Sequence, residues 1–138
     1  MLSFPPWYRL NKNLRNMDIF SEIILDHYKH PHNNGRLSDA THCATVFNPL
    51  CGDSITLDAR IDECGRIEEV RFQSKGCAIS TAAMSMLTDI AQGKEKKDIE
   101  LMNIEDIQGI LGVDLSPSRI KCALLGQEAL VRAFETRI

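Results

Sequence analysis

Residues 55–92, ITLDARIDECGRIEEVRFQSKGCAISTAAMSMLTDIAQ, change their hydrophobic period once, and this change predicts the fold. Before Gly76, apolar residues alternate with polar ones, which is the period of a half-buried strand. The alternating apolar residues are Ile55, Leu57, Ala59, Ile61, Val70 and Phe72. Gly65 marks a turn, so the pattern predicts an antiparallel hairpin. Ile67 falls out of phase and predicts a bulge near that turn.

After Gly76 the apolar residues recur at helical spacing. One face of the expected helix carries Ile79, Ala82, Ala83, Met86, Leu87 and Ile90. The helix should begin near Cys77 and end at Gly93, because glycine favours a helix end. Cys77 is therefore expected at a strand-to-helix junction.

The flanking sequence predicts the remaining elements before the hairpin. Apolar residues at helical spacing predict a helix over 18–29, which Pro31 stops, and residues 42–47 should add a third strand. Residues 48–53 contain proline and glycine and are expected to form a loop.

Helices are expected to dominate the second half of the chain. Residues 93–98 are expected to be a charged connector, and a short helix is predicted over about 103–110 with Asn103 as its N-cap. Ser116-Pro117-Ser118 should start the last helix. This order predicts an α+β domain in which a small three-stranded antiparallel sheet has helices packed on one face.

Length and composition favour one globular domain. The chain has 138 residues, with 16 Lys and Arg against 19 Asp and Glu, and a net charge of -3 at pH 7. Such a chain lacks the excess positive charge that usually binds nucleic acid or an anionic membrane surface. No apolar run reaches the roughly 18 residues of a membrane-spanning helix, and no secretory h-region is present. We therefore predict a cytoplasmic protein without nucleic-acid or membrane partners, in which a flexible extension (1–16) precedes the domain (17–138).

The chain contains five cysteines, an odd number in a chain long enough to fold without disulfides. Metal binding or thiol chemistry is therefore favoured over a disulfide framework. Cys51 precedes a glycine in a loop, where a metal or a partner can approach closely. Cys77 at a helix start and Cys122 beside Lys121 both have surroundings that favour a thiolate.

Asp53 adds a carboxylate two residues after Cys51, and in an extended segment such residues point the same way. Three thiolates and one carboxylate equal the number of ligands of a tetrahedral zinc ion or a 2Fe-2S cluster. No C-x-x-C of a zinc finger occurs, so folding must assemble any shared site. An oxygen ligand holds thiophilic iron less firmly than a thiolate, which suits temporary holding of a cluster. These residues alone leave zinc and iron open.

The other candidate ligands are expected to be structural. Cys43 on a strand and Cys64 in a turn have the positions of incidental thiols. His27, His30 and His32 flank a helix C-terminus, where histidine is favoured without a metal.

Four segments together resemble a known family. They are Asp18-Ile-Phe-Ser-Glu-Ile-Ile-Leu-Asp-His-Tyr28, Asn48-Pro-Leu-Cys-Gly-Asp53, Lys75-Gly-Cys-Ala-Ile-Ser80 and Arg119-Ile-Lys-Cys-Ala123. In this order they resemble the U-type iron-sulfur cluster scaffold family, which includes IscU, SufU and the N-terminal domain of NifU. The resemblance covers about residues 18–135. Several ordered motifs are more specific than any one alone.

The resemblance implies a scaffold and carrier protein and not an enzyme. In such proteins a cysteine desulfurase delivers sulfur, iron is added, and a transient 2Fe-2S cluster is passed to iron-sulfur acceptor or carrier proteins. The ligand cysteines of the family match Cys51, Cys77 and Cys122, and the aspartate that tunes cluster lability matches Asp53. Cys122 is the residue expected to accept persulfide sulfur. The implied protein is a monomer when it accepts sulfur, and a homodimer is allowed around the cluster.

One departure from the IscU pattern raises a second hypothesis, and one departure from the SufU pattern lowers it. Lys121 stands where IscU proteins carry histidine, as in SufU proteins, and is expected to pair with Asp53 when the site is empty. Yet the interval from Cys77 to Cys122 is too short for the SufU insertion. The alternative is a zinc-dependent sulfurtransferase of SufU type, with zinc on the same four residues.

The sequence disfavours one further partner and one further function. Residues 115–119 lack the Leu-Pro-Pro-Val-Lys signature of IscU, which argues against a dedicated Hsp70 chaperone as a partner. A thiol oxidoreductase is disfavoured because C-x-x-C is absent.

Overall fold

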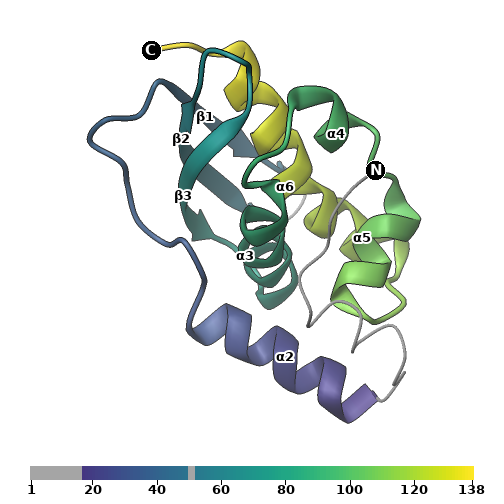
Figure 1. Cartoon of the computed structure of the whole chain (residues 1–138). Helices are drawn as coiled ribbons and strands as arrows, with labels where there is room; N and C mark the ends of the chain where they lie inside the picture. The colour runs from purple at the N-terminus through teal and green to yellow at the C-terminus, as the bar shows by residue number, and fades with distance from the viewer. Residues whose placement is uncertain (1–16, 50–51) are drawn as a thin grey trace.

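A computed structural model of the chain describes residues 17–49 and 52–138. In chain order the elements are α2 (Met17–Lys29), β1 (His42–Phe47), β2 (Ser54–Ile61), β3 (Ile67–Lys75), α3 (Ala78–Ala91), α4 (Lys96–Glu100), α5 (Ile104–Leu111) and α6 (Pro117–Glu135). The strands form one antiparallel sheet in the order β1-β2-β3, beside which the helices gather (Figure 1). The predicted α+β class is confirmed, and the predicted helices and strands lie close to their expected bounds.

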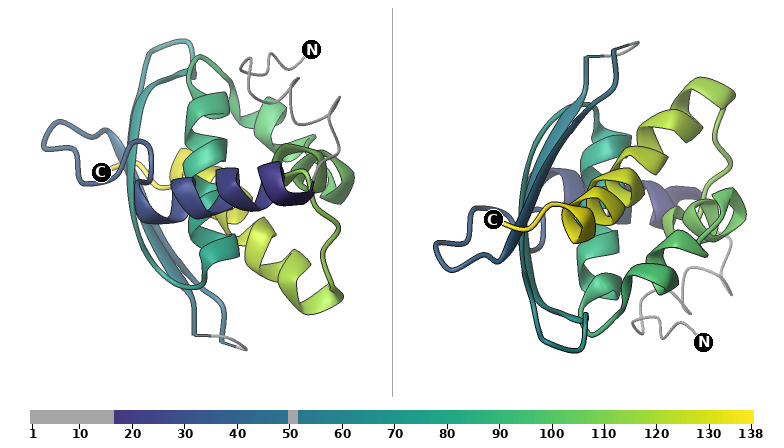
Figure 2. Two further views of the ribbon diagram at one scale, coloured as in Figure 1. Left: turned by 90° about the horizontal axis from the view of Figure 1, so that it is seen from below. Right: turned by 90° about the horizontal axis from the view of Figure 1, so that it is seen from above.

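The helices cover one face of the sheet. Figure 2 shows the sheet nearly edge-on, with α2, α3 and α6 on the same side of it. α6 packs against β1 and β2, and α3 packs against β3 and α6. The strand residues that face the helices are fully buried, among them Ile55, Leu57, Val70 and Phe72. Burying each such side chain contributes roughly 1.5–3 kcal/mol before conformational entropy is subtracted.

The predicted bulge is present where the hairpin nears its turn. Arg60 pairs with Glu69, but the next residue, Ile61, pairs with Ile67, so Glu68 is the extra residue. The shift returns Ile67 to the core face, where it is 2% exposed.

Asp58 lies on the polar side of β2, as its place in the alternation predicts, but it is buried. The segment after α2 crosses this side of the sheet, so Asp58 is only 3% exposed. Arg36 donates to its carboxylate from Nε at 2.7 Å and from Nη2 at 3.2 Å, and the backbone N–H of Leu37 donates at 3.0 Å. Burial raises the pKa of this carboxyl, but these donors outweigh burial and hold the pKa below its usual value.

The expectation of a charged connector over residues 93–98 is wrong from Lys96 onward. α4 begins within this segment, where the side chains of Glu95 and Asp98 form a reciprocal capping box. Gln127 of α6 then donates to two backbone carbonyls near the C-terminal end of α4. The short helix α4 is therefore stabilised by its cap and by tertiary contacts. Its charged composition does not reveal these contacts.

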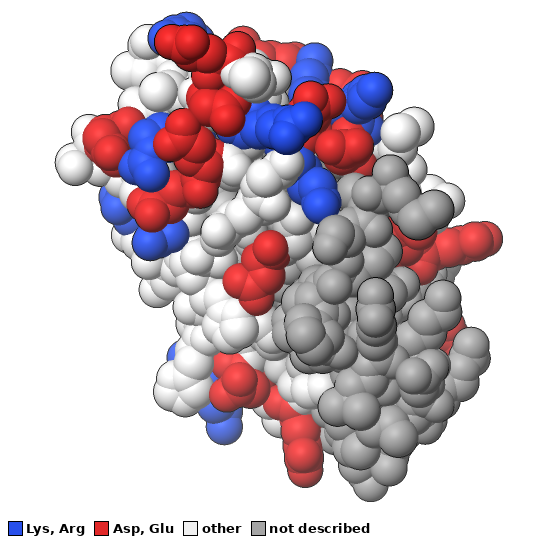
Figure 3. Space-filling view, in the orientation of Figure 1, with Lys and Arg blue, Asp and Glu red and all other residues white. Residues whose placement is uncertain are grey.

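The surface agrees with the balanced composition. In the view of Figure 3, side chains of both charges lie intermixed over the upper part of the molecule, and neither sign forms a continuous field there. Within the described ranges, no helix combines the length and the apolar character needed to cross a bilayer.

Candidate functional site

Three segments that are far apart in the sequence meet at one end of the sheet. Asp53 precedes β2, Cys77 follows β3, and Cys122 lies in the second turn of α6. A carboxylate oxygen of Asp53 and the Sγ atoms of Cys77 and Cys122 all lie within 4.8 Å of one another. The hairpin register pairs Ser54 with Lys75, so the start of β2 lies beside the end of β3. The register therefore brings Asp53 next to Cys77.

Cys77 is the N-cap of α3. Its backbone is extended (φ -75°, ψ 171°), and its Sγ accepts a hydrogen bond from the backbone N–H of Ser80 at 3.5 Å. The sulfur thus takes the place of the oxygen that usually caps a helix. The positive end of the helix dipole favours negative charge at this position.

Asp53 lies at the end of the loop that joins β1 to β2. The backbone N–H of Asn48 donates to the carbonyl of Asp53, and the N–H of Gly52 donates to the carbonyl of Asn48, both at 2.8 Å. Gly52 has a φ of +75°, a left-handed conformation that glycine adopts without strain. Asp53 itself is only 5% exposed.

Gly76 leaves the space that the Asp53 carboxylate occupies. A Cβ at residue 76 would lie 2.5 Å from Ser80 Oγ and 2.9 Å from Asp53 Cγ. Nonbonded heavy atoms are attracted at about 3.5–4.0 Å and repel at much shorter distances. The carboxylate can therefore approach Cys77 only because residue 76 has no side chain.

Gly126 has the same role between two helices. It lies one turn beyond Cys122 on α6, and a Cβ there would lie 2.9 Å from Met84 Sδ and 3.1 Å from Leu87 Cδ1 of α3. The absent side chain lets α6 approach α3 closely. The helix that carries Cys122, which is 4% exposed, is thereby held against the helix that Cys77 caps.

The donor set fits a thiophilic metal ion or the iron of a cluster. Thiolates bind zinc and iron-sulfur clusters, and zinc also accepts carboxylate oxygen. In a tetrahedral zinc site with bonds of roughly 2.0–2.3 Å, donor atoms lie about 3.3–3.8 Å apart. Separations of up to 4.8 Å therefore close with side-chain shifts of about 1 Å. The ligand roles of Asp53, Cys77 and Cys122 remain predictions.

Cys51, the fourth predicted ligand, lies outside the described residues. Lys121 is exposed next to Cys122, and its ion pair with Asp53 remains a prediction. Cys43 lies on β1 and is partly buried, and Cys64 lies in the exposed turn between β2 and β3. Neither belongs to the group of converging donor atoms.

His27 and His32 fasten α2 and the segment after it to α3. His27 Nδ1 lies 2.7 Å from Ser85 Oγ, and His32 Nδ1 lies 2.6 Å from a carboxylate oxygen of Asp89. The backbone N–H of His32 also donates to Ser85 Oγ at 2.8 Å. Burial, and then the nearby His32, lower the pKa of His27 against the opposing effects of Asp89 and Asp26.

No role was predicted from the sequence for three residues that shape the site: Gly76, Ser80 and Gly126. Gly76 and Ser80 lie in the motif around Cys77, where a glycine directly before a capping residue was an available signal. Gly126 stands in the middle of an amphipathic helix, where a glycine costs helix stability unless close packing requires it.

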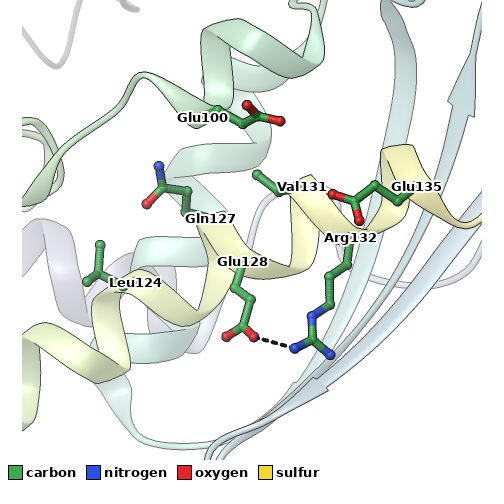
Figure 4. A pocket seen from close by; sticks show the side chains of 7 residues that line it. All are labelled: Glu100, Leu124, Gln127, Glu128, Val131, Arg132 and Glu135. Carbon is green, nitrogen blue, oxygen red and sulfur yellow. Dashed lines mark ion pairs between the residues drawn. The ribbon is translucent and has the colours of Figure 1, made fainter.

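A hollow of the surface along α6 contains no cysteine (Figure 4). Leu124, Gln127 and Val131 line it together with Glu128 and Arg132, which form an ion pair at 2.8 Å one turn apart. Its polar side chains are all engaged: Glu128 pairs with Arg132, Gln127 donates to the backbone carbonyls of Ile99 and Met102, and Glu100 and Glu135 pair with Lys96. We therefore assign the chemistry to the cysteine site and not to this hollow.

Comparison with known proteins identifies the family. The family model described as the NifU-like N terminal domain matches residues 19–136. The chain belongs to this family. One relative, from Bacillus subtilis (strain 168), is named zinc-dependent sulfurtransferase SufU. The two sequences are 36% identical over an aligned length of 135. The alignment covers 83% of this chain and 89% of the relative.

A second relative, from Streptococcus pyogenes serotype M1, is named iron-sulfur cluster assembly scaffold protein IscU. The two sequences are 37% identical over an aligned length of 134. The alignment covers 85% of this chain and 83% of the relative. The crystal structure of the N-terminal part of a NifU-like protein from Brucella abortus has the same fold. It superposes with a TM-score of 0.68 at 18% identity, over 86% of this chain and 93% of that one. Relatives of this chain thus bear both scaffold and sulfurtransferase names.

Proposed function

We propose that this chain is an iron-sulfur cluster assembly scaffold. A cysteine desulfurase donates sulfur, a 2Fe-2S cluster is assembled as cargo on Cys51, Asp53, Cys77 and Cys122, and acceptor or carrier proteins receive it. The observation that carries the proposal is the convergence of two sulfur atoms and a carboxylate oxygen within 4.8 Å. The family match over residues 19–136 supports it.

Cys122 is the proposed sulfur acceptor. Its thiolate attacks the terminal sulfur of a desulfurase persulfide. A new S–S bond forms at Cys122 while the S–S bond of the desulfurase breaks, and the desulfurase cysteine leaves as a thiolate. Because Cys122 is 4% exposed, the start of α6 must move before this attack. The first turn of α6 is suited to such movement, since residues 116–119 are exposed and Ser116 makes no side-chain capping hydrogen bond.

The proposal assigns the chain to the cytoplasm, where a desulfurase and acceptor proteins are its partners. A homodimer around the cluster and independence from a dedicated Hsp70 chaperone remain predictions of the same proposal.

The deciding experiment is metal and acid-labile sulfide analysis after strictly anaerobic purification. Reconstitution with iron, cysteine and a desulfurase should then give a visible-absorbing, oxygen-sensitive cluster with equal amounts of iron and sulfide. Asp53→Ala should slow cluster loss, because an oxygen donor is the weakest holder of iron in this set. A chain that stays colourless and iron-free contradicts the proposal, and unchanged transfer by Asp53→Ala contradicts the role of Asp53.

The second candidate function is a zinc-dependent sulfurtransferase. Lys121 favours it, since IscU proteins carry histidine there, and so does the relative that bears this name. Zinc held by the same four residues would keep the cysteines as thiolates. Tight stoichiometric zinc in protein purified without added metal, with strong stimulation of desulfurase turnover, would favour this function over the scaffold.

A further inference from the structure

Ser80 is a fully buried residue in direct contact with Cys77. Its exposure is 0%, its Oγ lies 3.7 Å from Cys77 Sγ, and the same Oγ donates to the backbone carbonyl of Cys77 at 3.1 Å. Its backbone N–H donates to Cys77 Sγ at 3.5 Å. The N–H contact follows from the helix start and is open to any residue except proline. The hydroxyl contact is specific to the side chain of residue 80.

The hydroxyl of Ser80 also lies close to Asp53. The point where a Cβ on Gly76 would stand is 2.5 Å from Ser80 Oγ and 3.1 Å from Asp53 Oδ1. The space above Gly76 is therefore shared by the serine hydroxyl and the aspartate carboxylate. Ser80 thus contacts the converging donor group at Cys77 and borders it at Asp53.

The hydroxyl can serve Cys77 in two ways. A serine hydroxyl has one proton and two lone pairs, and it rotates about the Cβ–Oγ bond. The contacts are those of a hydroxyl that donates to the Cys77 carbonyl and accepts from the thiol. A cysteine that ligates a metal is a thiolate, which accepts hydrogen bonds and donates none. Rotation of the hydroxyl alone then aims its proton at Sγ, without a change in the backbone.

We propose that Ser80 is a positioning residue that stabilises the ligand-bound form of Cys77 by donating its hydroxyl proton to Sγ. The inference rests on the proposed function, because it requires that Cys77 bind the metal or the cluster. A hydrogen bond to a charged acceptor is stronger than the neutral contact that it replaces. The bound form therefore gains more from Ser80 than the empty form does.

Ser85 provides a matched control. It lies on the same helix and is also 0% exposed, but its hydroxyl contacts His27 and the backbone N–H of His32. Ser80→Ala and Ser85→Ala therefore each remove one buried oxygen from α3. Only Ser80→Ala removes it from beside Cys77.

The experiment titrates the full chain anaerobically with Co²⁺ alone and then displaces the Co²⁺ with Zn²⁺. Wild type and Ser85→Ala should share one sulfur-to-cobalt absorption band and should agree in dissociation constant within about twofold. Ser80→Ala should bind about tenfold more weakly, the size of effect that partners of metal ligands commonly have. Its band should move to longer wavelength, because a thiolate that loses a hydrogen bond gives up electron density more easily.

The outcomes separate this inference from the proposed function. A Ser80→Ala protein that matches wild type in band position and affinity overturns the role of Ser80 alone. Equal weakening by Ser80→Ala and Ser85→Ala also overturns it, since that result reports packing. Ser80→Thr keeps the hydroxyl and should retain the wild-type band even if Ser80→Ala folds poorly; a shifted band there overturns the inference too. A wild-type chain without any sulfur-to-cobalt band contradicts the proposed function and this inference together.

Discussion

The carboxyl carbon of Asp53 lies 2.9 Å from the point where a Cβ on Gly76 would stand. The loop before β2 and the start of α3 therefore meet at a contact that only glycine permits. The distance between the Asp53 carboxylate and Cys77 depends on this contact, so a single methyl group there should disturb the site.

Gly76→Ala should weaken metal binding as well as the fold. The added methyl collides with Ser80 Oγ at 2.5 Å and with the Asp53 carboxyl carbon, which must shift away from Cys77. We expect a loss of Co²⁺ affinity of about tenfold or more. The free energy of unfolding should fall by about 1–3 kcal/mol, as for other overpacked sites. Co²⁺ titration and urea unfolding measure the two effects, and a large loss of stability with unchanged affinity would contradict this view.

Gly126→Ala should weaken the fold slightly and leave metal binding nearly unchanged. Its methyl meets the ends of the Met84 and Leu87 side chains, at 2.9 and 3.1 Å, inside the core and not at the donor atoms. Overpacking costs about 1–3 kcal/mol, and the better helix propensity of alanine returns roughly 1 kcal/mol. We expect a net loss of about 1 kcal/mol and a Co²⁺ affinity within about threefold of wild type. Equal effects of the two glycine substitutions on affinity would show that the site does not depend on the Asp53 contact.

Thiol alkylation should follow burial. We compare three of the four described cysteines. Exposed Cys64 should react first, partly buried Cys77 more slowly, and Cys122, which is 4% exposed, most slowly. Iodoacetamide labelling of the full chain, with mass spectrometry of the peptides, gives the three rates. Zn²⁺ should protect Cys77 and Cys122 and leave Cys64 unchanged. Labelling of Cys122 as fast as that of Cys64 would show that the start of α6 is already open.

Stability should fall as the pH is lowered through the range where unfolded histidine titrates. Burial and His32 lower the pKa of His27 below its usual 6.5, so the unfolded chain takes up a proton before the folded chain does. The contribution is complete above the usual value and is lost as the pH falls from there toward the folded value. His42 acts in the same direction, because burial and Arg137 lower its pKa.

Urea unfolding between about pH 7.5 and pH 5.5 measures this effect. His27→Asn should be less stable at neutral pH and should show a smaller pH dependence than wild type. Wild type and variant with equal pH dependence would assign the effect to other groups.

Most of the fold could be predicted because its elements have clear local patterns. The change of period at Gly76, the bulge signalled by Ile67 and the N-cap Asn103 at the start of α5 all match the structure. The burial of Asp58 could not be predicted, since its partner Arg36 comes from a segment without a regular pattern. α4 is too short for periodicity to reveal it, although Glu95 and Asp98 carried a capping signal.

The sequence named the three residues that converge in the candidate site but not their geometry, and their ligand roles stay predictions. The motifs named Asp53, Cys77 and Cys122, but their separations of up to 4.8 Å follow from strand register and helix crossing. Ser80 was quoted within a motif without a role, because its contact with Cys77 depends on where α3 begins. The separations of the donor atoms are set by tertiary structure, which spacing along the chain does not encode.

The donor atoms of Asp53, Cys77 and Cys122 belong to segments that only the folded chain brings together. A ligand that bridges them therefore binds the folded state in preference to the unfolded one. At a free concentration one hundred times its dissociation constant, such a ligand adds about 2.7 kcal/mol to the free energy of unfolding. Under the proposed function, handing over the cargo would leave a measurably less stable protein, and the folding equilibrium would report whether the chain is loaded.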